Sequence, residues 1–127
     1  MIVTDKRVAE FVGKKVGSAI YPPFTCLGTE SEGEIINGVV FNCFTRTDIH
    51  VTIAGERWSK GFLTLVGHYV FSKLRCERMT AITEQVKIVR IAERLGGKVE
   101  GCMRNHFGPG RDGFVVGILR DEWKYGK

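Results

Sequence analysis

Hydrophobic and polar residues follow two different periods along this chain, and these periods predict the order of its strands and helices. Between residues 48 and 54, apolar residues occupy every second position, which is the pattern of a half-buried strand. We therefore expect Asp48–Ala54 to be a central strand that carries His50 and Thr52 on one face.

Several other segments are rich in apolar and β-branched residues over strand-like lengths. The strands expected in addition are residues 24–27 (a short edge strand), 35–44, 78–83, 98–104 and 113–119. Residues 30–34 form an acidic turn between two of them. Within 35–44, the pair Asn37–Gly38 is compatible either with a tight turn or with a bulge inside a strand.

Three segments have apolar residues at helical spacing. We expect a short helix at Val8–Val12 that is ended by Gly13, and a long, well-buried helix from about Trp58 to Leu74. A third, amphipathic helix covers residues 86–95 and is followed by a glycine pair, where a left-handed C-cap is usually found.

The resulting order of elements predicts the fold class. Strand, helix and strand between residues 78 and 104 form a βαβ-like unit. With the remaining strands, this order predicts a mixed α/β (α+β) fold around a mostly antiparallel sheet flanked by helices. A length of 127 residues corresponds to a single domain, 1–127.

Composition narrows the class of protein and excludes some kinds of site. Neither a membrane-spanning apolar window nor a secretory signal pattern is present, so we expect a cytoplasmic protein. Four cysteines are far apart, without a Cys-x-x-Cys pair, and three histidines are scattered, so we expect no metal site. The net charge of +5 suits nucleic acid, an acidic substrate or a phosphorylated cofactor.

Two consecutive sequence pieces resemble a known family. Residues 90–96 read Arg-Ile-Ala-Glu-Arg-Leu-Gly, and residues 99–105 read Val-Glu-Gly-Cys-Met-Arg-Asn. They resemble the C-terminal half of the GNAT acetyltransferases, and are most similar to the branch that includes the N-terminal acetyltransferases of ribosomal proteins. The similarity extends back to residues 69–71 and forward through 112–123. It implies a sheet in which two central strands splay apart and admit acyl-coenzyme A.

The loop from Gly55 to Gly61 lies between the central strand and a helix N-terminus. Free backbone N–H groups and the helix dipole make such a place suitable for an anion. The resemblance assigns this loop to the coenzyme A pyrophosphate, but the family pattern Arg/Gln-x-x-Gly-x-Gly/Ala falls on Ala54, Arg57 and Ser59 and is degenerate. An ordinary strand-to-helix loop is the alternative interpretation.

The resemblance implies cofactor contacts from the strand, the loop and the following helix. These residues are Val51, Ile53, Ala54, Arg57, Trp58, Ser59, Lys60, Gln85, Lys87 and Arg90. Lys87, Arg90 and Arg94 share one helix face, so a solvated charged face is the alternative. The tyrosine that some family members use as general acid falls on Ala92.

Acyl transfer needs a held thioester, a polarised carbonyl and a base for the amine. The backbone of residues 51–54 would supply the first two. His50 is the first candidate for the base, directly or through water, and Glu84 is the second. By analogy with the family, Tyr21, Arg104 and Asn105 lie where the acceptor binds.

The function expected from the sequence is N-acetyl transfer from acetyl-CoA, as co-substrate, to a small-molecule or peptide amine. The alternative is a catalytically inactive GNAT-fold protein that binds a ligand or a partner. A nucleic-acid-binding domain ranks last, because most aromatic residues have core spacing. We expect no membrane partner, and a homodimer is left open.

Overall fold

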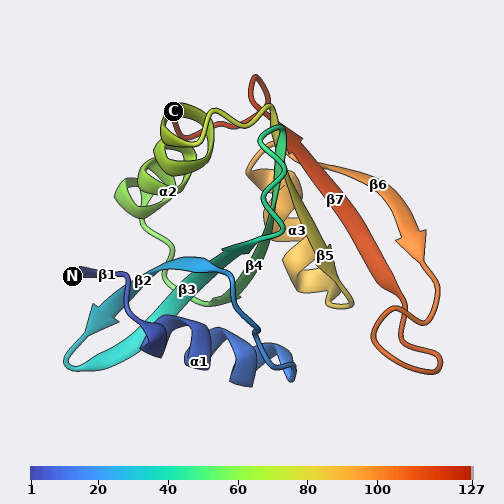
Figure 1. Ribbon diagram of the computed structural model, residues 1–127, viewed down its shortest axis with the longest axis horizontal. Coiled ribbons are helices and arrows are strands. Elements are labelled where there is room, and N and C mark those ends of the chain that lie inside the picture. The colour runs from blue at the N-terminus through green and yellow to red at the C-terminus, as the bar shows by residue number, and fades with distance from the viewer. Residues whose placement is uncertain (127) are drawn as a thin grey trace.

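The computed structural model describes residues 1–126, which form one seven-stranded sheet flanked by helices (Figure 1). The strands are β1 Ile2–Val3, β2 Thr25–Ser31, β3 Glu34–Asn42, β4 Asp48–Gly55, β5 Arg78–Thr83, β6 Lys98–Met103 and β7 Gly113–Leu119. Their order in the sheet is β1-β2-β3-β4-β5-β7-β6. Every neighbouring pair is antiparallel except β4–β5, so the predicted mixed, mostly antiparallel fold is confirmed.

The helices cover both faces of this sheet. They are α1 Lys6–Val16, α2 Lys60–Gly67 with its π-helical continuation η1 His68–Lys73, and α3 Val86–Arg94. Helix α1 packs on β2, β3 and β4, whereas α3 packs on β5, β6 and β7. Alternate residues of β3 face opposite sides: Val40 contacts the core under α1, and Val39 contacts the core under α2 and η1.

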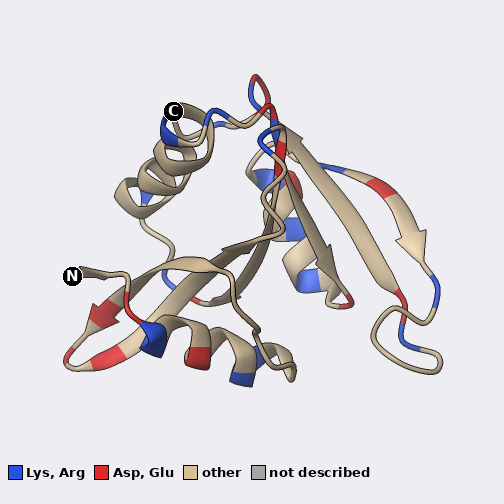
Figure 2. Cartoon of the chain, viewed as in Figure 1, with Lys and Arg blue, Asp and Glu red and all other residues tan. Residues whose placement is uncertain are grey.

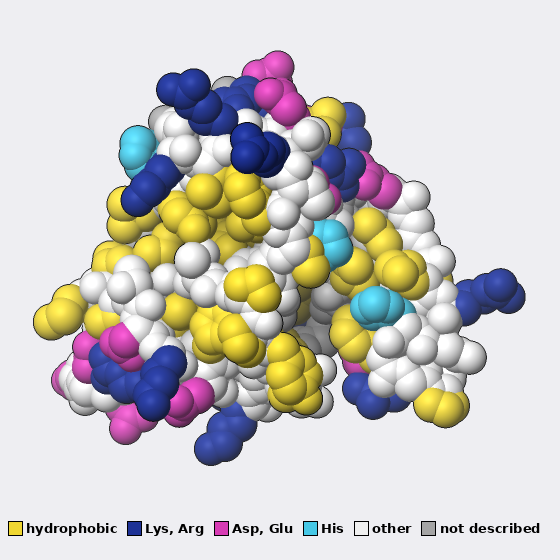
Figure 3. Space-filling model, viewed as in Figure 1, with side chains coloured by type: hydrophobic (Ala, Val, Ile, Leu, Met, Phe, Trp, Pro, Cys, Tyr) yellow, Lys and Arg dark blue, Asp and Glu magenta, His cyan; other side chains and the backbone are white. Residues whose placement is uncertain are grey.

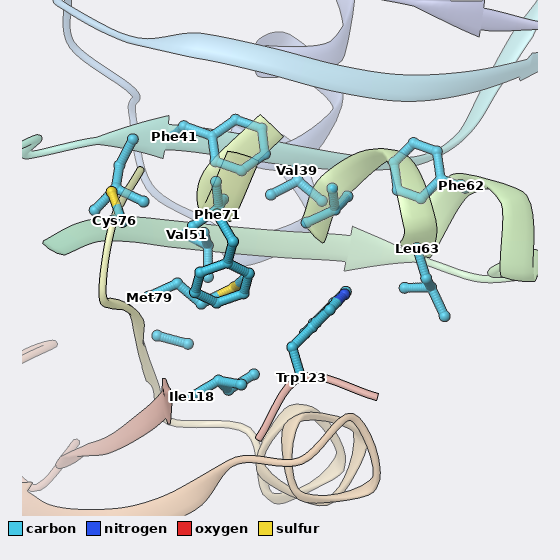
Figure 4. Packing of buried hydrophobic residues seen from close by; sticks show 14 residues of the cluster. Val39, Phe41, Val51, Phe62, Leu63, Phe71, Cys76, Met79, Ile118 and Trp123 are labelled. Carbon is cyan, nitrogen blue, oxygen red and sulfur yellow. The ribbon is translucent and has the colours of Figure 1, made fainter. Parts of the chain in front are cut away.

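The larger core lies between the sheet and the α2–η1 segment (Figure 4). Phe41 from β3, Phe62 from α2 and Phe71 from η1 are each at most 1% exposed. Trp123, beyond the last strand, is also buried and closes the side of this core that faces α3. The aromatic end of the chain is thus a structural part of the fold.

The predicted helix at Val8–Val12 exists, but its predicted bounds were too short. Asp5 caps its start by accepting a hydrogen bond from the Arg7 backbone N–H, and hydrogen bonds from the Arg7 side chain lower the pKa of Asp5 to about 2. The helix runs through Gly13 and ends at Gly17, whose φ is 71°. Glycine costs a helix interior only about 1 kcal/mol, so packing of α1 on the sheet overrides it.

The prediction of an edge strand at residues 24–27 was wrong in its position. Strand β2 runs to Ser31, lies between β1 and β3, and leaves only Glu32 and Gly33 as the turn. Strand β1 has two residues, too few to show a period. Asn37–Gly38 lies inside β3, beside a bulge at Ile36 where the register with β2 shifts.

Other boundaries agree closely with the sequence pattern. Strands β5 and β7 match their predicted ranges, and β6 differs by one residue. The long helix begins at Lys60 rather than Trp58, because Ser59 is its N-cap. Strands β5 and β6 are joined through α3 as predicted, but β7 lies between them in the sheet.

Two absences concern the described part of the chain. None of the helices in residues 1–126 has the length and apolar character that crossing a membrane requires. The same residues hold no cluster of three or more potential metal ligands. The assignment of residues 1–127 to a single domain stays a prediction.

Candidate functional site

The central feature of the molecule is a gap between its two parallel strands. Strands β4 and β5 are paired only at Asp48↔Arg78, Ile49↔Met79 and His50↔Thr80. Beyond this apex they diverge, and Figure 1 shows them as the two arms of a V. Their outer edges stay paired: β4 with β3 as far as Gly55, and β5 with β7 as far as Thr83.

The divergence leaves a strand edge open in the middle of the sheet. Along Val51–Gly55, alternate residues direct N–H and C=O groups towards the missing neighbour. Backbone groups inside a protein are nearly always hydrogen-bonded, so this edge is suited to a ligand with amide groups that can pair as a strand would. The splay that the family resemblance implied is thus present.

Three hollows meet at this gap, and Ile53 lines all of them. The first, which we call the apolar groove, is a cavity of about 350 Å³ between α2 and α3. The second, the polar groove, has about 210 Å³ and opens on the sheet face that α1 covers. The third, the mouth groove, has about 420 Å³ and lies where the strands are furthest apart.

The walls of the two inner grooves differ in chemistry. The apolar groove is lined by side chains such as Val51, Leu63, Val66, Ile91 and Trp123. Figure 4 shows Trp123 lying between Leu63 and Ile118. The polar groove is lined instead by residues that include Asn42, Thr52, Thr83, Glu84 and Phe107. A molecule lying in the gap is therefore exposed to an apolar wall on one side and to polar groups on the other.

The loop at the end of β4 is held by a buried asparagine. Asn37 is fully buried, and its Nδ2 donates to the carbonyl oxygens of Glu56 (3.0 Å) and Arg57 (3.3 Å). The φ of Arg57 is 59°, a left-handed conformation that favours glycine, and the family pattern has glycine at this position. An exposed arginine thus adopts here the left-handed backbone conformation that glycine adopts most easily.

The following helix start leaves donors and cations near the mouth groove. Ser59 Oγ accepts from the Phe62 N–H, while the N–H groups of Lys60 and Gly61 have no partner within the helix. Lys60 and Arg57 are exposed beside them. Trp58 packs on Phe62 and lines the apolar groove, and its buried Nε1 has no hydrogen-bond partner among the described residues.

The opposite side of the mouth is the start of α3. The Gln85 N–H donates to Thr83 Oγ1 at 3.0 Å, whereas its exposed side chain makes no cap. Lys87 and Arg90 are exposed on the same helix, and Figure 2 shows basic residues along α3. Among the residues that line the mouth groove, Lys15 and Lys87 are basic and Glu34 and Glu56 are acidic. Arg57, Lys60 and Arg90 are exposed outside this lining, so further cations for a phosphorylated ligand lie around the groove.

His50 lies at the apex, one residue before the gap opens. It shares a strand face with Thr52, which lines the polar groove, and its Nε2 is 3.9 Å from Asp48 Oδ2. Both oxygens of Asp48 lie 2.9 Å from the hydroxyl of buried Thr80. Arg78 bonds Thr80 and Glu100, and the Glu100 hydrogen bond raises the pKa of Arg78.

Glu84 lines the polar groove, but both of its oxygens are engaged. Arg111 donates to them from Nη2 at 2.8 Å and from Nε at 3.2 Å. This ion pair ties the loop of residues 105–112 to the end of β5, and Phe107 of that loop lines the same groove. Of the two candidate bases, His50 is therefore the less constrained.

The three predicted acceptor residues are dispersed. Tyr21 is 77% exposed and lines a separate hollow beside Phe44, outside the polar groove. Arg104 is exposed at the end of β6. The side chain of Asn105 accepts from the Gly110 N–H at 2.9 Å, so it stabilises its own loop. Their assignment to the acceptor stays a prediction.

Other groove residues were not predicted as site residues. Leu63, Ile91 and Leu95 lie within the helices predicted at residues 58–74 and 86–95. Apolar periodicity alone does not distinguish a side chain in the packed core from one that lines a cavity. Trp123 and Tyr125 reach the apolar groove from the end of the chain, a contact with no local sequence signal.

Comparison with known proteins identifies the fold. No protein-family model matches the chain, and no curated protein does. Mutant forms of the spermidine/spermine N-acetyltransferase SpeG from Vibrio cholerae superpose with a TM-score of 0.72 at 12% identity, covering 95% of both chains. Aminoglycoside 6'-acetyltransferase type Ii gives a TM-score of 0.65 at 10% identity, over 94% of this chain and 97% of that one. The chain has the GNAT fold.

A third structure with this fold is a ribosomal-protein acetyltransferase. The ribosomal-protein-S5-alanine acetyltransferase from Vibrio fischeri superposes with a TM-score of 0.62 at 17% identity, covering 80% of this chain. This chain covers 64% of that protein, so it spans slightly less than two thirds of its length. At these identities the comparisons establish the fold, and the activity must be argued from the site.

Proposed function

We propose that this chain is an N-acyltransferase, which moves an acyl group from a coenzyme A thioester to an amine acceptor. Acetyl-CoA is the donor that the sequence resemblance implies, and the acceptor would be a small-molecule or peptide amine. The transfer would be direct, with donor and acceptor bound together.

One observation carries this proposal: the open edge of β4 faces two grooves of opposite polarity. The amide groups of a pantetheine arm could pair with residues 51–55, and its phosphates would meet the basic residues around the mouth groove. The polar groove would bring the amine to the thioester from the other side of the sheet. Few other ligands combine amides, phosphates and a reactive end in this order.

The chemistry asked of the protein is modest. A backbone N–H in residues 51–54 would bond the thioester oxygen and stabilise the negative charge that develops on it. The amine nitrogen would form the new C–N bond as the C–S bond breaks. The amine proton would pass to a base, and the departing thiolate would gain a proton. Most of the rate would come from holding the two reactants in the gap.

His50 is the base in this proposal, acting directly or through a water molecule. The Asp48 carboxylate near its Nε2 would stabilise the imidazolium formed after proton transfer. Glu84 stays the second candidate.

Reversing the charge at Arg57 is expected to weaken acetyl-CoA binding about tenfold, because an exposed carboxylate would face the donor phosphates. The effect should shrink at high salt, where exposed charges are screened. Binding calorimetry at two salt concentrations measures it.

Arg46→Glu is the matched control for Arg57→Glu. Arg46 is also exposed and also left-handed, with φ of 75°, but it precedes β4 at the end away from the mouth. If both substitutions weakened acetyl-CoA binding equally, the loss would come from the change in net charge and not from a local contact between Arg57 and the phosphates.

Replacing His50 with alanine is expected to lower turnover at least about a hundredfold, the contribution typical of a general base. Donor affinity should change little, because the open β4 edge begins one residue later. Steady-state kinetics combined with donor titration separates the two quantities. Near-normal turnover would show that His50 is not the general base, and Glu84 would then be the candidate to test.

A second function is favoured by one observation. The degenerate loop carries Arg57 in place of glycine, and a fold that had lost catalysis could tolerate such a change. A ligand-binding or interaction protein would bind coenzyme A or another ligand in the gap without turnover. A screen of amine acceptors with acetyl-CoA distinguishes this alternative from the enzyme.

A further inference from the structure

We infer that the apolar groove holds the acyl chain of the donor, and that the preferred chain is longer than acetyl, in the range of four to eight carbons. This inference rests on the proposed function, because it places the thioester in the gap between β4 and β5. It adds the chemical class of the acyl group, which neither the fold nor the sequence resemblance specifies.

Continuity of the hollows gives the direction of the acyl chain. Val51, Ile53 and Ala81 line both the apolar and the polar groove, so the two grooves adjoin across the gap. The amine must approach from the polar groove, where hydroxyl and amide side chains can solvate it. A substituent on the thioester carbonyl that points away from the amine therefore enters the apolar groove.

The groove is larger than an acetyl group needs. Its volume of about 350 Å³ corresponds to roughly a dozen water molecules at about 30 Å³ each. Acetyl places a single methyl group beyond the carbonyl and would leave most of this space unfilled. Apolar surface left in contact with water is unfavourable, and a chain of several methylenes would cover it with favourable contacts.

The groove also continues deeper than the gap itself. Its inner wall includes Met79 and Ile118, which are 2% and 4% exposed. Met79 is paired with Ile49, one position before the strands diverge, so the hollow passes behind the apex of the V. This depth is what an extended acyl tail requires.

The composition of the lining disfavours a charged tail, although two lining residues, Trp58 and Trp123, have indole N–H groups without a partner among the described residues. The inner part is formed by buried apolar side chains, including Val66 and Trp123. Arg94 is the single charged residue that lines the groove within residues 1–126, and it is exposed on α3. Burying a charge in the inner part would be costly, so a hydrocarbon tail is favoured over a charged one.

Two small residues keep the groove open. Ala81 on β5 and Ala92 on α3 are both buried in its walls, at 7% and 3% exposure. Ala92 is also the position where some family members carry a general-acid tyrosine. A larger side chain at either position would occupy the space assigned to the acyl tail.

The test is a binding series with the wild-type chain. Coenzyme A and its acetyl, butyryl, hexanoyl and octanoyl thioesters are titrated by calorimetry. Each buried methylene is expected to tighten binding by up to about fourfold. Hexanoyl-CoA should therefore bind at least about tenfold tighter than acetyl-CoA. In the Ala92→Leu variant, whose folding is checked by thermal melting, the affinity should depend less on the length of the acyl chain. In the control variant Thr83→Val, which alters the polar groove, this dependence should be the same as in the wild-type chain.

The outcomes separate this inference from the proposed function. If acetyl- and hexanoyl-CoA bind equally tightly, the inference is wrong and the acyltransferase proposal stands. If none of the thioesters binds, the proposed function fails, and the inference with it. If free hexanoate binds as tightly as hexanoyl-CoA, the groove is an independent fatty-acid site, which also overturns the inference.

Discussion

Gly55→Ala is expected to destabilise the fold by about 3 kcal/mol. Gly55 ends β4 with φ of 102°, a conformation that costs other residues about 1–2 kcal/mol. A Cβ there would also lie 2.3 Å from the Ile36 carbonyl oxygen and 2.5 Å from the Asn37 Cα. Both atoms belong to the backbone of β3, so relief requires the two strands to separate. Chemical denaturation measures the change in free energy of unfolding.

Gly61→Ala is the matched control for Gly55→Ala. Gly61 lies six residues later in α2, has no backbone strain, and would place its Cβ no closer than 4.0 Å to a neighbouring atom. Alanine should stabilise this helix by about 0.5–1 kcal/mol. A small effect at Gly55, comparable to that at Gly61, would show that the β3–β4 contact is looser than described.

Ile53→Trp is expected to weaken acyl-CoA binding by at least about 2 kcal/mol, or about thirtyfold. Ile53 is half-buried and lines all three grooves, so an indole at this position would obstruct the donor and the acceptor together. The loss should appear in donor titration and in the Michaelis constant for the amine.

Val99→Trp supplies the control for added bulk. Val99 is 47% exposed on β6, an edge strand that β5 and β7 separate from β4, and the same substitution there should leave donor binding unchanged. If Ile53→Trp binds acyl-CoA like the wild-type chain, the gap is not the donor site.

The strands were the most predictable part of the fold, for physical reasons. Strands β5 and β7 pack in the interior of the sheet, so their apolar runs have clear limits in glycine and charged residues. Strand β4 shows its period of two because its faces differ in polarity. Helix α1 and strand β2 were misjudged because tertiary packing overrides Gly13 and because the two-residue β1 carries no local signal.

The sequence predicted the candidate site only where the residues of the site are close together in the chain. Residues 53–56 and the start of α3 line the mouth groove, and the assignment of this stretch to a cofactor stays a prediction. The left-handed conformation of Arg57 and the buried Asn37 that holds its carbonyl depend on contacts between β3 and the loop, so no spacing rule indicates them. Likewise, the apolar groove is completed by Trp123, which is distant in sequence from β4.

Figure 3 shows the face on which the acceptor would approach: it is hollowed between the part that carries α1 and the part that carries β6 and β7. The hollow follows from the divergence of β4 and β5, and the same divergence produces the open backbone edge. One structural feature thus accounts for both the proposed donor site and the proposed acceptor route.

The central claim, that this open edge binds an acyl-CoA thioester, is tested most directly by calorimetric titration of the wild-type chain with acetyl-CoA. We expect saturable binding at one site per chain. We also expect about 2.7 kcal/mol of added stability when acetyl-CoA is present at about 100 times its dissociation constant. No heat of binding and no stabilisation up to millimolar acetyl-CoA would contradict the claim and leave a GNAT fold that serves another purpose.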